Sequence, residues 1–80
     1  MSHTPHELNE EFPQQVEQMA ALRQSDNHFA KLSESYHTVN RAIHRAEADV
    51  EPTSDDHMQQ MRRERLALKD EIANYLREKA

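Results

Sequence analysis

The chain has 80 residues, a net charge of −5 and no cysteine. A chain of this length lies near the lower limit for an independently folding domain, so a second domain is excluded. The absence of cysteine excludes disulfides and the cysteine-based zinc, haem and iron–sulfur frameworks, and it suits a reducing cytoplasm.

The sequence also lacks glycine and has only three prolines, so it contains few of the residues that form hairpin turns in sheets. We therefore expect an all-α protein. No apolar run approaches the ~20 residues of a membrane span, and the first twelve residues lack the basic and apolar regions of a signal peptide. We expect a cytoplasmic protein without membrane attachment.

The first elements in chain order are divided by the dipeptide Phe12-Pro13. Proline cannot continue a helix from before it but is favourable at a first helical position. Residues 1–11, rich in histidine and glutamate, are therefore predicted to be a flexible N-terminal extension. A short helix is predicted from about 13 to 24, within a single domain that covers residues 12–80.

The next helix has the strongest pattern in the chain, with apolar residues at alternating steps of three and four. These residues are Phe29, Leu32, Tyr36, Val39, Ile43, Ala46 and Val50. Such spacing is typical of one face of a coiled-coil helix. Ser25 is a favourable N-cap and Asp26 then lies in the first turn, so a helix is predicted from about 26 to 48.

Pro52 disfavours helix at the preceding residue, and Thr53 or Ser54 then caps a third helix, from about 54 to 78. Two long helices joined by a short turn must lie antiparallel, so the fold is predicted to be a helical hairpin with coiled-coil-like packing and a short additional N-terminal helix. The apolar residues then oppose each other in layers, with Val39 facing Arg65 in the one layer that is not apolar. The other predicted pairs are Ile43 with Met61, Tyr36 with Leu68, Leu32 with Ile72, and Phe29 with Tyr75.

Three sequence motifs resemble those of the YdcH-like family, which consists of small bacterial proteins of unknown function. They are Phe12-Pro13, then Asp26-x-x-Phe29-x-x-Leu32 with Asn40-x-x-Ile43, and the run Arg65-Leu66-x-Leu68-Lys69-Asp70-Glu71-Ile72. The resemblance covers Phe12 to Leu76 and implies a helical-hairpin fold, but no activity. Where family members often have aspartate, this chain has Asn40.

Few large apolar side chains are available to build a core in this chain, and this favours self-association. On the third helix, Leu66, Ala73 and Leu76 widen the apolar stripe beyond what one facing helix covers. We therefore expect a homodimer that uses these three residues as its oligomer face.

Arg65 is predicted to lie in the hairpin interface beside Asn40. Its guanidinium can bind the Asn40 carbonyl oxygen or extend to a carboxylate, or the side chain can simply fold out to solvent. The hypothesis is a polar layer that fixes the register of the hairpin, as single polar residues do in coiled coils. On this hypothesis, Asn40→Asp strengthens the layer by making it charge-assisted.

Arg62, Arg63, Arg65 and Lys69 form a basic stripe on the third helix, and this stripe leaves two functions open. The preferred one is a non-catalytic interaction or scaffold module, with Arg62, Arg65 and Lys69 pairing with acids or contacting an unidentified protein partner. The alternative is a nucleic-acid-associated accessory protein that uses the stripe. Nucleic-acid binding is disfavoured because the same helix carries an equal number of acids.

Catalysis, small-molecule binding and cofactor binding are disfavoured because a two-helix hairpin has almost no interior in which to exclude water. Neighbouring carboxylates such as Asp55 and Asp56 point about 100° apart on a helix, so they cannot share a proton. The N-terminal His3, His6, Glu7 and Glu10 have a spacing that suits a divalent metal, but solvated side chains are the preferred interpretation. The expectation is a protein with no enzymatic activity, no metal and no cofactor.

Overall fold

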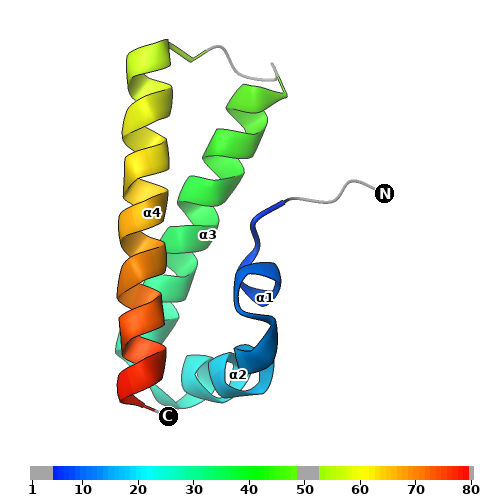
Figure 1. Cartoon of the computed structure of the whole chain (residues 1–80), viewed down its shortest axis with the longest axis vertical. Helices are drawn as coiled ribbons and strands as arrows, with labels where there is room; N and C mark the ends of the chain where they lie inside the picture. Colours follow the sequence, from blue (N-terminus) through cyan, green and yellow to red (C-terminus); the bar gives the residue numbers. More distant parts are fainter. Residues whose placement is uncertain (1–4, 49–52, 80) are drawn as a thin grey trace.

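The computed structural model of the protein describes residues 5–48 and 53–79 (Figure 1). In chain order its elements are α1 (Leu8–Glu11), a 3₁₀ turn η1 (Pro13–Gln15), α2 (Val16–Ser25), α3 (Asn27–Glu47) and α4 (Asp55–Glu78). Helices account for all the regular secondary structure in these two ranges. The prediction of an all-α fold is therefore confirmed.

The two longest helices, α3 and α4, lie side by side and antiparallel along the long axis of the molecule (Figure 1). Their bounds agree with the predicted helices to within one residue. The rings of Phe29 and Tyr75, a predicted opposed pair, are stacked with their centroids 5.9 Å apart. The helical hairpin is thus confirmed, while the predicted turn at Glu51-Pro52 lies outside the described residues.

The start of α3 differs from the prediction, because Asp26 rather than Ser25 is its N-cap. Asp26 has an extended backbone, and its carboxylate accepts hydrogen bonds from the amides of His28 and Phe29 at 3.0 and 3.1 Å. Ser25 is the last residue of α2, and its hydroxyl donates to the Ala21 carbonyl at 2.9 Å. Ser54 caps α4 by accepting from the His57 amide at 3.2 Å, as one of the two predicted candidates.

The core lies where α1 and α2 pack against the hairpin. In Figure 1, α2 lies near the end of the hairpin that holds the C-terminus, beside the start of α3, and α1 lies farther along on the same side of the hairpin. One cluster of buried side chains joins all four helices and consists of Leu8, Met19, Phe29, Leu32, Tyr36, Ile72 and Leu76. The short N-terminal helices therefore complete the core that the hairpin alone leaves open.

The N-terminal segment also differs from the prediction of a flexible extension over residues 1–11. Residues 8–11 form α1, and only 6% of the Leu8 surface is exposed. Burying a leucine contributes about 1.5–3 kcal/mol, which offsets part of the entropy of about 1–2 kcal/mol per residue that is lost on ordering the segment. Residues 1–4 lie outside the described part of the chain.

No helix in the described ranges is both long enough and apolar enough to cross a membrane.

Candidate functional site

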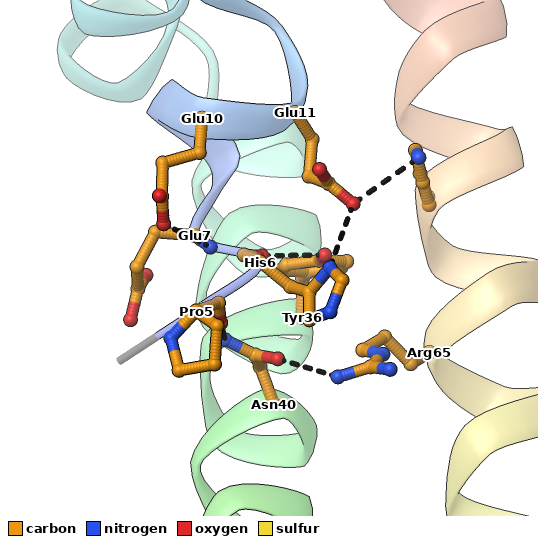
Figure 2. Close-up of polar contacts among 9 residues, drawn as sticks. Pro5, His6, Glu7, Glu10, Glu11, Tyr36, Asn40 and Arg65 are labelled. Atoms are coloured by element: carbon orange, nitrogen blue, oxygen red, sulfur yellow. Dashed lines mark hydrogen bonds and ion pairs between the residues drawn. The ribbon is translucent and has the colours of Figure 1, made fainter. Parts of the chain in front are cut away.

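Three side chains form a polar layer where the N-terminal segment meets the hairpin (Figure 2). We use "polar layer" for Tyr36, Asn40 and Arg65. Arg65 Nη1 donates to Asn40 Oδ1 at 2.9 Å, which joins α4 to α3. Only 1% of the Asn40 surface is exposed, so this hydrogen bond satisfies an amide oxygen that water does not reach.

The polar layer also holds the main chain of the N-terminal segment. Asn40 Nδ2 donates to the Pro5 carbonyl at 2.9 Å, and the Tyr36 hydroxyl donates to the His6 carbonyl at 2.7 Å. Burial raises the pKa of Tyr36 to about 12, and the nearby Glu11 carboxylate adds to the effect. Tyr36 therefore remains a neutral donor throughout the physiological pH range.

Charged side chains flank these main-chain contacts. Lys69 Nζ lies 3.2 Å from Glu11 Oε1, and His6 Nδ1 lies 3.3 Å from the same oxygen. His37 Nδ1 lies 3.1 Å from Glu7 Oε2. Burial raises the pKa of Glu11, but the hydrogen bonds and charges of Lys69 and His6 together hold it below its ordinary value.

The structure brings some of the predicted site residues together and separates others. Arg65 and Asn40 are in direct contact, and Lys69 contacts the N-terminal segment through Glu11. Arg62 lies at the far end of the stripe and pairs with Glu47 of α3 at 3.0 Å, across the hairpin. Three of the four basic residues therefore contact groups of their own chain. This leaves less uncompensated positive charge than the basic stripe suggested.

The three residues of the predicted oligomer face differ in their exposure to solvent. Leu66 is 58% exposed and Ala73 is partly exposed, but Leu76 is only 4% exposed. Leu76 belongs to the core cluster, and its carbonyl accepts a hydrogen bond from Gln18 Nε2 of α2 at 3.0 Å. Assigning Leu76 to an oligomer face was therefore wrong, because α2 of the same chain covers it.

Within residues 5–48 and 53–79, no three or more histidine and acidic side chains are grouped to hold a metal ion. His3 of the considered metal set lies outside this part of the chain. A cleft of about 410 Å³ lies beside the N-terminal segment, with Leu8 and Glu7 on one wall and Ser33 and His37 on the other. The cleft therefore lies between the N-terminal segment and α3.

The hairpin is also the part of the chain that is similar to other known proteins. The model of a family described as "Protein of unknown function (DUF465)" matches residues 29–76. The chain belongs to this family. The YdcH-like resemblance is thereby confirmed, since the YdcH-like proteins belong to the DUF465 family. No curated protein and no solved structure matches the chain significantly.

The polar layer lies within the region that matches the DUF465 family, whereas Pro5, His6 and Glu11 lie before it. Sequence reasoning identified Arg65 and Asn40 but missed Tyr36 as a polar contact, because its spacing made it a core residue. It also missed the N-terminal partners, since two of them contribute only main-chain carbonyls. Leu8, four residues before Phe12, was the signal that this segment packs.

Proposed function

We propose that the chain is a non-catalytic protein–protein interaction module of the cytoplasm that self-associates through the exposed face of α4. The observation that carries the proposal is Leu66, which lies in the middle of α4 and is 58% exposed. A second copy that packs its own Leu66 against this side chain removes both from water. Two-fold pairing of this kind is the commonest form of association between identical chains.

The small core supports the same proposal. Nine apolar residues of the described chain are buried, so the net stability of a single copy is a small difference between burial and chain entropy. An association that buries further apolar surface stabilises the folded chain by mass action.

Sedimentation equilibrium at increasing concentration tests the proposal, since one chain has a mass of 9.4 kDa. The wild-type mass is expected to rise toward that of two chains, and Leu66→Gln is expected to remain a single chain. Ala67→Gln is the matched control, because Ala67 is also exposed but lies on the adjacent face of α4. A wild-type mass of one chain at millimolar concentration, with helicity retained, contradicts self-association.

A further inference from the structure

The N-terminal segment, residues 5–12, lies on the hairpin in the way that a bound peptide lies on a protein. Two side chains of α3 donate to the segment's main chain: the Asn40 amide to the Pro5 carbonyl and the Tyr36 hydroxyl to the His6 carbonyl (Figure 2). Every peptide has such carbonyls, so these contacts are not specific to this sequence. Main-chain hydrogen bonds for affinity and side-chain pockets for specificity are the usual division in peptide recognition.

The side chains of the segment supply a specific pattern. Leu8 is buried in the core cluster, and Phe12 is partly buried against it. Glu7 contacts His37, and Glu11 contacts Lys69. The two residues between Leu8 and Glu11 are exposed. Glu10 accepts from the Glu7 amide within the segment and not from the hairpin surface in that contact. The surface therefore selects an acid followed by leucine, with a second acid and an aromatic residue three and four positions after the leucine.

The surface that binds the segment is held in place by the hairpin itself. Arg65 fixes the orientation of the Asn40 amide by binding its oxygen, so the amide nitrogen faces the Pro5 carbonyl. Tyr36, His37 and Asn40 lie on α3, while Arg65 and Lys69 lie on α4. None of these five residues depends on the N-terminal segment for its place in a helix.

The segment, in contrast, is held weakly by its own structure. Its helix α1 has four residues, which is one turn, and isolated helices of that length are unstable in water. His6 has a φ of 64°, in the left-handed region that costs free energy for any residue other than glycine. A different peptide with glycine at this position avoids that cost.

We propose that Tyr36, His37, Asn40, Arg65 and Lys69 form a binding surface for a short acidic peptide of a partner protein, which residues 5–12 occupy until the partner displaces them. The surface favours an acidic partner, because the Lys69 ammonium lies 3.2 Å from the Glu11 carboxylate and the His37 ring lies 3.1 Å from that of Glu7. The proposal does not depend on self-association through Leu66, since Leu66 contributes nothing to this surface.

Binding of a labelled synthetic peptide to the full-length chain tests the proposal. The peptide carries the sequence of residues 5–12 with glycine in place of His6, and binding is followed by fluorescence anisotropy. Leu8→Ala in the protein weakens the resident segment, so the chain is expected to bind the peptide at least about tenfold more tightly than wild type. A Leu8→Ala chain that retains its helicity without any gain in affinity overturns the proposal.

Two further comparisons separate recognition from nonspecific binding. In the Leu8→Ala background, Lys69→Ala is expected to weaken peptide binding about tenfold, whereas Lys31→Ala, at an exposed position of α3, is not. A peptide with Glu7→Gln and Glu11→Gln is expected to bind about tenfold or more weakly. Equal binding across these pairs overturns the proposal.

A second variant covers the case in which Leu8→Ala disrupts the core. Glu11→Gln removes the negative charge that pairs with Lys69 without creating a cavity, and it is expected to tighten peptide binding by a factor of about three to ten. If Glu11→Gln also leaves binding unchanged, the proposal is wrong. If wild-type copies form a dimer that Leu8→Ala abolishes, the occupant is the N-terminal segment of a second copy, which overturns the assignment to a partner protein.

Discussion

Asn40→Asp separates the two contacts that Asn40 makes, and its effect follows directly from the structure. The amide oxygen accepts from Arg65 and the amide nitrogen donates to the Pro5 carbonyl. A carboxylate keeps the first contact and turns it into an ion pair with the Arg65 guanidinium, but it has no proton for the second. It also places an oxygen where the Asn40 nitrogen lies 2.9 Å from the Pro5 oxygen. The N-terminal segment should therefore be held more weakly on the hairpin.

The magnitudes of the two changes nearly cancel for the whole fold. The lost hydrogen bond to Pro5 costs about 0.5–1.5 kcal/mol, and turning the Arg65 contact into an ion pair adds about 1 kcal/mol or less to a hydrogen bond that already has a charged donor. The desolvation cost of burying the carboxylate offsets part of that gain. We expect the free energy of global unfolding to change by less than about 1 kcal/mol, while the local stability of residues 5–12 falls by more than about 1 kcal/mol.

Amide hydrogen exchange measures both quantities in one experiment. The amides of Glu11 and Phe12 bond to the carbonyls of Glu7 and Leu8 at 3.0 and 2.8 Å, so they report on the N-terminal segment. Asn40→Asp is expected to speed their exchange about fivefold or more and to leave the slowest amides of α3 and α4 nearly unchanged.

The matched control for this exchange experiment is Thr38→Asp, which adds the same charge at an exposed position of α3. It is expected to leave the exchange of both amides at the wild-type rate. Wild-type exchange of these amides in Asn40→Asp would refute the reasoning, because the Pro5 contact would then not hold the segment.

Three further predictions follow from single contacts. Tyr36→Phe removes the donor to the His6 carbonyl and is expected to lower the free energy of unfolding by about 1 kcal/mol in a denaturant titration. Asp26→Ala removes the N-cap of α3 and is expected to cost about 1–2 kcal/mol, whereas Ser25→Ala should cost much less; equal costs would argue against Asp26 as the cap. The pKa of Glu11 is held below its ordinary value of 4.5, and hydrogen bonds from the Tyr75 hydroxyl and two backbone amides hold that of Asp26 below 3.8. The stability that these ionised groups contribute is therefore present above those values and lost as the pH falls below them. The temperature of the denaturation midpoint should therefore decrease as the pH is lowered from about 5 to about 3.

The hairpin could be predicted from the sequence because several independent signals agree on it. The apolar spacing from Phe29 to Ile43 specifies one buried face, and Ser54 marks the start of α4. The error at the start of α3 has a local cause, since Ser25 and Asp26 are both favourable N-caps. The Ser25 hydroxyl instead binds back to Ala21 within α2, which leaves Asp26 to cap α3.

The position of the N-terminal segment could not be predicted because its contacts leave almost no pattern in the sequence. Pro5 and His6 contribute carbonyl oxygens, which every residue has. Leu8 and Phe12 are the only large apolar residues of the segment, and two residues do not establish a periodicity that marks a buried face. The interpretation of Leu76 failed for the same reason, since nothing in the hairpin pattern indicates that α2 packs against it.

The contact between the polar layer and the N-terminal segment defines both the candidate site and the proposed peptide-binding surface. Proton NMR tests this contact most directly, through nuclear Overhauser effects from the Asn40 side-chain amide. The Asn40 nitrogen lies 2.9 Å from the Pro5 carbonyl oxygen, so its protons should show cross-peaks to the α protons of Pro5 and His6 and exchange slowly with water. A rapidly exchanging Asn40 amide, with cross-peaks only within α3 and α4, would contradict the account.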